Sequence, residues 1–391
     1  MTAQAPGSDP AERSDRACLA RLVEPGSWAV YDAVAERGAG EVVAALRQGR
    51  RVGAVSEAVA QGALARSAEV DGTRDLRRLA AAGGRLVVPG DDEWPEHRLT
   101  WPRVPSLPAP PLALHVRGRP PLGVTVERSV AVVGARAATA YGEHVAGELG
   151  LGLTDAGWVV VSGGAYGIDG AAHRGALASD RGPTVAVLAC GVDVAYPRGN
   201  DRLLARIAEG GLLVSEHPPG AAPTRLRFLV RNRLIAALTV GTVVVEAALR
   251  SGSLSTAGRA TDLNRQVMAV PGPVTSALSA GCHALVRGQG TLVTGVREVL
   301  AQVGRMGDDD APEQRGVEHP RDSLPEAVRR VLDAVPVRGG AGEAALARDA
   351  GIPVGAVQQI LPPLLVAGLV QRCDTGWRLT ALGAGKPGAA L

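Results

Sequence analysis

Residues 158–177 read WVVVSGGAYGIDGAAHRGAL, and this stretch joins three features that together indicate one class of fold. It begins with an apolar β-branched run, passes through a glycine-rich turn and ends in a segment of helical pattern. A continuous apolar run is typical of a strand that is buried on both faces of a sheet. Further runs of this kind occur at residues 130–133, 184–188, 212–215, 242–246 and 266–270.

Stretches of helical pattern separate most of these runs, and alternation of strand and helix is typical of a parallel sheet with helices on both faces. The sequence therefore predicts an α/β fold with a Rossmann-like, doubly wound parallel sheet over residues 118–303.

The region before the predicted sheet has a different composition. Residues 1–15 are small and polar, and we expect a disordered tail there. Residues 16–100 contain short amphipathic patterns that predict a helical domain. Residues 101–117 are rich in proline, and we expect them to connect this domain to the sheet.

The region after the sheet begins with a charged, polar segment, residues 304–323, which we expect to be a linker. Residues 324–382 show three helical patterns followed by a hairpin, the order of a winged-helix domain. Its candidate recognition helix, residues 354–367, has no basic residue, and Pro362 and Pro363 should kink or shorten it. A domain that binds duplex DNA needs basic side chains for affinity to phosphates. We therefore expect this domain to be a protein-contact or regulatory module.

Composition restricts the class of protein. The 391 residues carry a formal net charge of only +3, so a basic binding site would have to be local. The four cysteines are widely spaced and indicate neither a disulfide framework nor a metal site. We find no signal-peptide pattern and no apolar run of about 18 residues. We therefore expect a cytoplasmic protein without a membrane span.

Glycine-rich loops follow the predicted strands, and ligands of open parallel sheets bind beyond the carboxyl ends of the strands. The loops are residues 134–136, 162–169, 190–191 and 250–253. Glycines allow close backbone approach, and free N–H groups at the following helices attract phosphate. Any one of these loops is as easily a plain connector, but several at one sheet edge favour an anion site.

An enzyme that acts on a nucleotide is the main alternative. The first loop, VGARAATAYGE at 133–143, fits the dinucleotide fingerprint poorly, and SGGAYG at 162–167 lacks the lysine of a P-loop, so we expect no cofactor. Asp169 and His173 are one helical turn apart and could act as acid and base, although a buried structural hydrogen bond is the commoner role. No other catalytic or metal-binding pattern occurs.

Residues 224–238, TRLRFLVRNRLIAAL, hold the only phenylalanine of the chain, Phe228. Around it lie Arg225, Arg227, Arg231 and Arg233, and no acid occurs between Glu216 and Glu246. We expect a helix to begin near Leu229. Because arginines oppose the positive end of a helix, an anionic partner would explain them. Arginines that bind phosphates and an aromatic ring that stacks on a base are the minimum that a binding site for single-stranded nucleic acid needs. The alternative is a core Phe228 with arginines paired to distant acids.

Seven motifs occur in order: VAVVGAR, SGGAYGIDGAAHRGAL, TVAVLACGVDVAYPRGN, LLVSEHPPG, RFLVRNRLIAAL, VVVEAALRSGSLSTAGRA and VMAVPGPV followed by SAGCHALVRGQG. Together they closely resemble the DNA-processing protein A family, also called DprA or Smf. The resemblance is dense over residues 130–293 and looser upstream. It implies a non-enzymatic protein that binds and protects single-stranded DNA and helps load the recombinase RecA onto it in natural transformation and recombination. It also implies a homodimer, a helical SAM-like N-terminal domain and, as in many members, a C-terminal winged helix.

The resemblance also places the DNA-binding residues. By motif match they are Arg136, Arg225, Phe228, Arg231 and Arg233, with Ser162, Gly163, Gly164, Ser251 and Gly252 nearby. We include Tyr166, Arg227, Asn232 and Ser253 in the expected DNA-binding set, although the role of Asn232 could be structural, and expect structural roles for Asp169, His173 and Glu246. Two positions depart from the family pattern. Tyr166 stands where an arginine is common, so that either one basic contact is lost or Tyr166 stacks on a base. Leu229 follows Phe228 where many relatives have proline, which puts the path of that segment in doubt.

Overall fold

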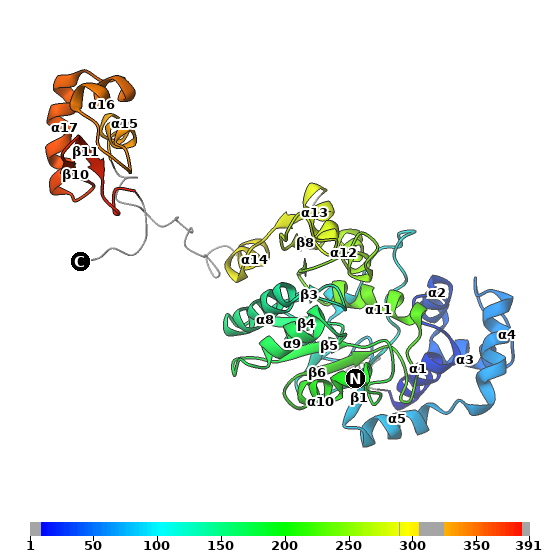
Figure 1. Cartoon of the computed structure of the whole chain (residues 1–391). Coiled ribbons are helices and arrows are strands. Elements are labelled where there is room, and N and C mark those ends of the chain that lie inside the picture. The colour runs from blue at the N-terminus through cyan, green and yellow to red at the C-terminus, as the bar shows by residue number, and fades with distance from the viewer. Residues whose placement is uncertain (1–8, 289, 305–323, 385–391) are drawn as a thin grey trace, which may run out of the picture. The chain divides into compact units, whose positions relative to one another are not determined.

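The computed structural model describes residues 9–288, 290–304 and 324–384. The chain falls into two compact units, residues 1–311 and 312–391, and each is described by itself (Figure 1). The predicted linker, residues 304–323, lies outside the described residues except for Gly304.

The first unit is built on a nine-stranded sheet in the order β1-β2-β6-β5-β4-β3-β7-β8-β9. Strands β3 to β9 pair in parallel, whereas β1 and β2 add an antiparallel edge. The strands are β1 Gly84–Val87, β2 Leu114–Arg117, β3 Ser129–Val133, β4 Val159–Ser162, β5 Thr184–Val187, β6 Leu212–Ser215, β7 Gly241–Val244, β8 Gln266–Ala269 and β9 Thr291–Leu292. The large, mostly parallel α/β sheet and all six predicted strands are confirmed.

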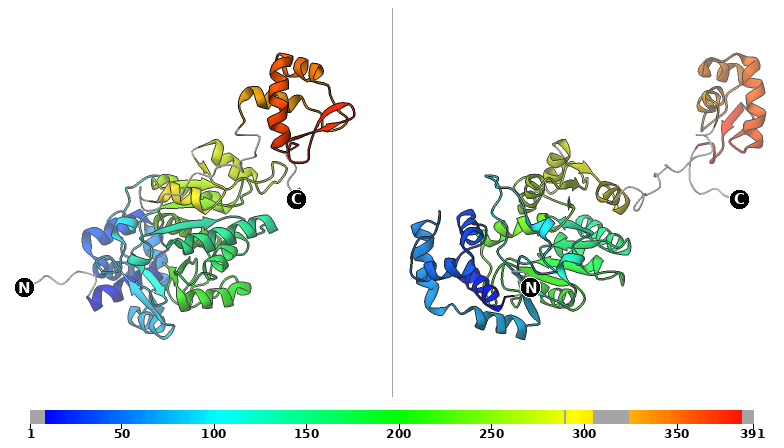
Figure 2. Two further views of the ribbon diagram at one scale, coloured as in Figure 1. Left: turned by 90° about the vertical axis from the view of Figure 1, so that its left-hand side faces the viewer. Right: turned by 180° about the vertical axis from the view of Figure 1, so that it is seen from behind.

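Helices cover both faces of the sheet because alternate residues of each buried strand point to opposite sides. Val130 and Val132 of β3 pack with α8, α9 and α14, whereas Ala131 and Val133 pack with α11 and α12 on the other face. Figures 1 and 2 show this layered arrangement. The helices are α8 Ala140–Asp155, α9 Ile168–Ala176, α10 Asp201–Gly210, α11 Arg225–Ala237, α12 Gly252–Asp262, α13 Ala280–Arg287 and α14 Val296–Val303.

Short helices precede the sheet, as the sequence predicts, but two boundaries differ. They are α1 Pro10–Leu22, α2 Trp28–Arg37, α3 Ala39–Arg47, α4 Glu57–Arg66, η2 Ser67–Glu69 and α5 Gly72–Ala81. Helix α1 begins inside the tail expected to be disordered, because Asp9 caps its first turn. Strands β1 and β2 lie in segments predicted as helical and connecting. Neither is a continuous apolar run, since β1 contains Arg85 and β2 contains His115, so both depend on pairing with neighbouring strands.

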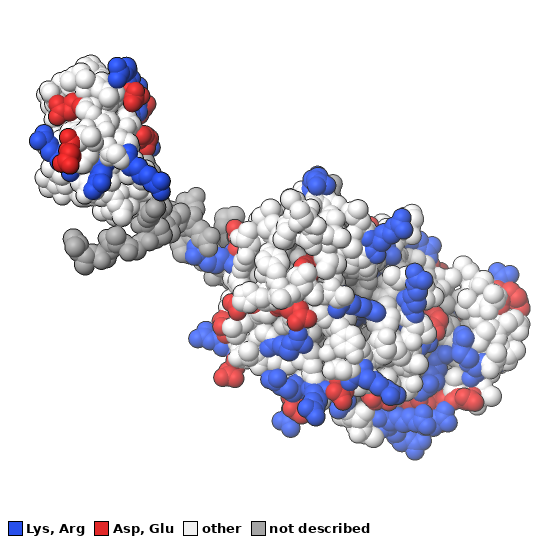
Figure 3. All heavy atoms as spheres, in the orientation of Figure 1, with Lys and Arg blue, Asp and Glu red and all other residues white. Residues whose placement is uncertain are grey.

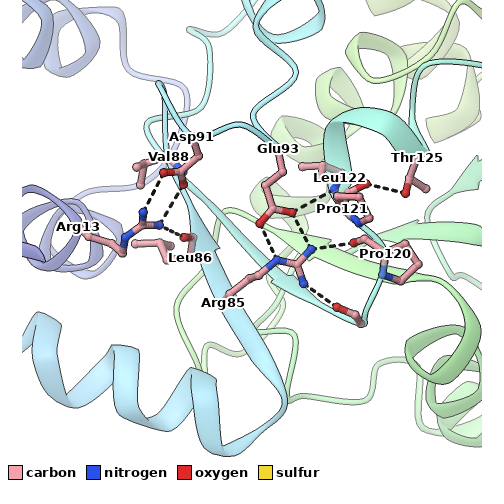
Figure 4. Close-up of polar contacts among 11 residues, drawn as sticks. Arg13, Arg85, Leu86, Val88, Asp91, Glu93, Pro120, Pro121, Leu122 and Thr125 are labelled. Atoms are coloured by element: carbon pink, nitrogen blue, oxygen red, sulfur yellow. Dashed lines mark hydrogen bonds and ion pairs between the residues drawn. The ribbon is translucent and has the colours of Figure 1, made fainter. Parts of the chain in front are cut away.

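Two arginine–carboxylate pairs hold the N-terminal helices and the β1 edge together (Figure 4). Arg13 of α1 donates to both carboxylate oxygens of Asp91 at 3.0 and 2.8 Å. Arg85 of β1 donates to both oxygens of Glu93 at 2.6 Å and to the carbonyl oxygen of Gly118 at 2.6 Å. Such bidentate pairs fix the relative orientation of the two side chains as well as their distance. They therefore join α1, β1 and the segment that leads into β3.

The second unit has α15 Glu326–Ala334, α16 Glu343–Ala350, α17 Val354–Val366, β10 Val370–Cys373 and β11 Gly376–Leu379. The three helices and the hairpin occur where the sequence predicts them. The expectation that the prolines shorten the third helix is wrong, since Pro362 and Pro363 lie inside α17. Both prolines are exposed, while Leu361 and Leu364 are buried in the core of this unit and hold the helix in place.

Two further observations concern the chain as a whole. No helix in the described ranges is long and apolar enough to cross a membrane. All four cysteines are free thiols.

Glycines allow α8 and α9 to pack with their backbones in contact. A methyl group on Gly175 of α9 would overlap the carbonyl oxygen of Gly147 of α8, and one on Gly150 would overlap the carbonyl oxygen of Ala172. The side chain of an alanine therefore cannot enter at Gly175 or Gly150 unless the helices move apart. At Gly147 the nearest atom, the carbonyl oxygen of Ala171, would be 4.0 Å from the added carbon, so there is room.

We expect Gly175→Ala to lower the free energy of unfolding of the first unit by about 1–3 kcal/mol, the usual range for overpacking. The matched control is Gly147→Ala, which should be neutral or stabilise by up to about 1 kcal/mol because alanine is the better helix former. Urea denaturation of both variants tests this. Equal losses of stability would show that the two helices are not packed through Gly175.

Candidate functional site

The candidate site lies where the strand order of the sheet reverses. Beyond β3 the chain leads into α8, and beyond β7 into α12, so the loops after these two neighbouring strands diverge. Open α/β sheets bind ligands at this position. A cavity of about 430 Å³ opens there, and we call it the switch-point cleft. Its lining includes Gly134, Arg136, Ala165, Asp169, Tyr196, Thr224, Arg225, Phe228, Leu229, Arg231, Asn232, Ser251, Gly252 and Ser253.

Helix α11 supplies one wall of the switch-point cleft, between α12 and the N-terminal helices (Figure 1). It begins at Arg225, where the hydroxyl oxygen of Thr224 accepts a hydrogen bond from the N–H of Arg227 at 3.3 Å. The prediction of a start near Leu229 is therefore wrong by one turn. The threonine cap was the signal that would have placed it. With the longer helix, Arg225, Phe228 and Asn232 fall on the face towards the cleft.

Phe228 is half-buried and forms the centre of this wall. The guanidinium carbon of Arg136 lies 4.7 Å from the ring centroid, and that of Arg231 lies 5.7 Å from it. The ring of Tyr196 is a third neighbour, with its centroid 5.6 Å away. Because Phe228 lines a cavity that opens to solvent, the alternative of a core phenylalanine is wrong.

Tyr196 is a cleft residue that the sequence did not identify. Its ring lines the cleft and is partly exposed. A signal existed, since Tyr196 belongs to the loop that follows β5 at the same edge of the sheet.

Arg231 is buried at the back of the cleft. Its Nη1 donates to the carbonyl oxygens of Gly163, at 3.0 Å, and Val187. Burial lowers the pKa of Arg231 to about 10, and the negative charge of Asp169 opposes this shift. Burial likewise raises the pKa of Asp169, and Arg231 opposes that. The Nε of Arg231 has no hydrogen-bond partner in the described chain, which is unusual for a buried donor.

Arg233 and Arg227 do not line the cleft. Arg233 is fully buried, and its two Nη atoms donate to the carboxylate oxygens of Glu216 at 2.6 and 2.7 Å. Arg227 donates to both carboxylate oxygens of Glu24, at 3.0 and 2.6 Å. For these two arginines the alternative of pairing with acids outside the segment is correct, since Glu216 lies 17 residues from Arg233 and Glu24 lies 203 residues from Arg227. Arg233 has no surface with which to contact DNA.

The glycine turn after β4 lies mostly behind the residues that line the cleft and supports them. The hydroxyl of Ser162 is buried and donates to the carbonyl oxygen of Val132 at 2.6 Å. The N–H of Gly163 donates to Asp169 at 3.1 Å, and Gly164 has a φ of 66°, which favours glycine. Tyr166 is exposed, and its hydroxyl oxygen accepts from the N–H of Gly199 at 3.1 Å. Ser162, Gly163, Gly164 and Tyr166 are therefore outside the lining.

The predicted hydrogen bond between Asp169 and His173 is absent. The Nδ1 of His173 instead bonds the hydroxyl of Thr184 at 2.8 Å, because the imidazole points away from the cleft towards β5. Burial lowers the pKa of His173 to about 3. Glu246 accepts from the N–H and the hydroxyl of Thr139, at 2.9 and 2.6 Å, and thereby holds the start of α8.

The N-terminus of α12 forms the opposite wall. The hydroxyl oxygen of Ser251 accepts from the N–H of Ser253 at 3.3 Å, and the two hydroxyls are 2.7 Å apart. The side-chain amide of Asn232 donates to the carbonyl oxygen of Gly252 at 3.2 Å and so links α11 to α12. Two helix N-termini thus face the cleft, and each favours an anion. Asp169 is the one acid among the described lining residues.

The chemistry of this arrangement is that of binding. Exposed and buried guanidinium groups suit phosphate, hydroxyls and helix N-termini add donors, and two aromatic rings offer flat surfaces. Within the described part of the chain, no group of three or more His, Cys, Asp or Glu side chains is placed to hold a metal ion.

Comparison with known proteins points to one family. The model of the family described as DNA recombination-mediator protein A matches residues 85–304. A Mycobacterium tuberculosis protein named as a DNA processing protein, DprA, is 46% identical over 387 residues, which is 97% of each chain. Protein Smf of Escherichia coli is 38% identical over 303 residues, 74% of this chain and 76% of its own. The X-ray structure of DprA from Streptococcus pneumoniae has a TM-score of 0.61 at 31% identity, covering 76% of this chain and 99% of that one.

Breaking the Arg233–Glu216 pair tests whether Arg233 is structural. We expect Glu216→Ala to lower the free energy of unfolding by about 3–5 kcal/mol, because it leaves a fully buried guanidinium without its counter-charge. The matched control is Glu24→Ala, which removes the half-exposed partner of Arg227 and should cost less than about 1 kcal/mol. Urea denaturation followed by tryptophan fluorescence measures both, and similar midpoints would contradict the assignment.

Proposed function

The chain belongs to the DNA recombination-mediator protein A family, and from this premise we propose that its switch-point cleft binds single-stranded DNA. The observation that carries the proposal is the position of Phe228, with the guanidinium groups of Arg136 and Arg231 within 6 Å of its ring. An aromatic platform accepts any base, and the arginines beside it neutralise phosphates. Binding should therefore tolerate all sequences and weaken as salt rises.

Arg136 covers part of the ring that a base would use. Its side chain is exposed and so is free to turn aside. An exposed cation–π contact is worth about 0.5–1 kcal/mol. Base stacking on an aromatic side chain contributes about 1–3 kcal/mol. Replacing the cation–π contact of Arg136 by a stacked base is therefore favourable. The displaced guanidinium of Arg136 stays beside the strand, where it binds phosphate.

The proposed interface is a revision of the set expected from sequence. It keeps Arg136, Arg225, Phe228, Arg231, Asn232, Ser251, Gly252 and Ser253, which line the cleft, and adds Tyr196. Arg233 leaves the set because it is buried and paired with Glu216. Ser162, Gly163 and Gly164 support the wall. Tyr166 and Arg227 are partly exposed outside the cleft.

The finer role is proposed by resemblance to the family. We place the chain among proteins that protect single-stranded DNA and help load RecA onto it during DNA uptake and recombination, acting as homodimers. In this proposal α1 to α5 form the SAM-like domain, and residues 324–382 form a winged helix. The order of three helices and a hairpin supports the second assignment. His173, one half of the candidate acid–base pair, is buried and bonded to Thr184.

We expect Phe228→Ala to weaken binding of single-stranded oligonucleotides by roughly 1–3 kcal/mol, equally for different base sequences, because a stacking surface is lost. Arg136→Gln should weaken binding and reduce its dependence on salt concentration. Fluorescence anisotropy at two salt concentrations measures both. Arg206→Gln is the control, since Arg206 is an exposed arginine of α10 outside the cleft. Parent-like affinity in both cleft variants would refute the proposed site.

The C-terminal unit should add little to DNA affinity. Residues 324–380 carry six arginines against five acids, and α17 has no basic side chain. A chain that ends after Gly304 should therefore bind single strands as the full chain does, and the full chain should bind duplex DNA only at the nonspecific level. Side-by-side titrations of both chains test this. A marked loss of affinity on truncation would make the C-terminal unit part of the DNA interface.

A further inference from the structure

A second hollow lies on the other side of the first turn of α11. It has a volume of about 850 Å³ and opens between α4, η2 and α5 on one side and the segment of residues 218–222 on the other. Five arginines line it, and we call it the arginine groove: Arg21, Arg66, Arg74, Arg78 and Arg227. Basic side chains also gather around α5 and towards α1 and α4 in the space-filling view (Figure 3).

The charges of the arginine groove are only partly compensated. Arg21 pairs with the buried carboxylate of Asp75, and Arg227 pairs with Glu24. Glu69 is the one acid among the described lining residues. Five arginines against these three carboxylates leave an excess of two positive charges in a concave surface, where fields are focused.

Among the residues that the structure describes, the remaining three arginines have no carboxylate partner. Arg66 donates to the carbonyl oxygen of Leu22, and Arg74 donates to that of Glu69. These contacts hold the side chains in place without neutralising them. The Nε of Arg74 is buried and has no partner in the described chain. Arg78 is exposed, so its guanidinium is free to contact a ligand.

The groove and the switch-point cleft are adjacent along the chain. Pro223, Thr224 and Arg225 line the cleft, whereas Ala221, Ala222 and Arg227 line the groove. One short segment and one helical turn therefore separate the two hollows. The N-terminal turn of α11 thus contributes side chains to both hollows.

We infer that the arginine groove binds the phosphodiester backbone of the same DNA single strand that the cleft holds. This inference rests on the proposed function of the cleft and extends it to the N-terminal helices. The groove lining has no aromatic side chain and is floored by small residues such as Ala65, Ala68 and Ala221. It therefore suits phosphates and gives no base stacking, so its contribution depends on strand length and on salt but not on sequence.

The test compares two pairs of substitutions that change net charge equally. The groove pair is Arg66→Gln with Arg78→Gln, and the control pair is Arg50→Gln with Arg77→Gln, two exposed arginines outside the groove. Arg77 and Arg78 are neighbours on α5, so they differ mainly in the direction of the side chain. Oligothymidylates of about 4 to about 16 nucleotides, the range of single-strand sites in other folds, are titrated against the full chain at several salt concentrations.

We expect the groove pair to weaken binding of the longer strands only. The slope of log affinity against log salt should become less steep by about 1.4 for two lost contacts to a single strand. The shortest strands that still bind should have the same affinity for the groove pair as for the parent chain. The control pair should match the parent at every length.

Two outcomes would overturn the inference. If the groove pair equals the control pair at all lengths, the groove holds no DNA and its charge serves a different partner, such as an acidic protein segment. If the groove pair weakens short and long strands alike, the effect is one of general charge. Phe228→Ala in the same titration separates the two proposals, because its loss of affinity on short strands depends on the cleft alone.

Discussion

The divergence of the chain after β3 and β7 is the constraint on which the rest of the molecule depends. These neighbouring parallel strands lead to helices on opposite faces of the sheet, because each crossover is right-handed. No helix then covers the space between the two strand ends, and backbone N–H groups remain available there. Arg136 reaches the space from one loop, Ser251 from the other, and α11 closes it from the side. The topology makes the cleft, and the side chains give it its chemistry.

The C-terminal half of helix α11 packs in the core, and its N-terminal half lines the cleft. Residues 234–238 are buried among the strands, while Arg225 and Phe228 face the cleft. The buried pair of Arg233 and Glu216 lies between the two halves. Such pairs add little stability compared with well-packed apolar side chains, but their hydrogen bonds fix a geometry. A shift of one residue would rotate the helix by about 100° and turn Phe228 away from the cleft.

The sequence predicted those parts of the fold that rest on local pattern. Six buried strands were predictable because each is a continuous apolar run followed by a helix. Strands β1, β2 and β9 were missed. Arg85 interrupts the apolar pattern of β1 and His115 that of β2, and β9 has only two residues. Within the site, the loops and Phe228 were predictable from their places after strands and among arginines. The direction of each arginine was not, because Glu216 and Glu24 come from distant segments and leave no periodic signal.

The choice of arginine over lysine around Phe228 has a physical reason. A guanidinium lies flat on a ring and still presents N–H groups at its edge, whereas an ammonium is a compact, strongly hydrated charge. The guanidinium carbons of Arg136 and Arg231 both lie within 6 Å of the centroid of the same ring. Burial, opposed by Asp169 and assisted by the charge of Arg136, lowers the pKa of Arg231 to about 10, which still leaves it charged at neutral pH. The free cleft therefore holds two repelling cations close together, with one buried carboxyl nearby. In the proposed function, a phosphate bound between the two guanidinium groups would relieve that repulsion and so add to the affinity.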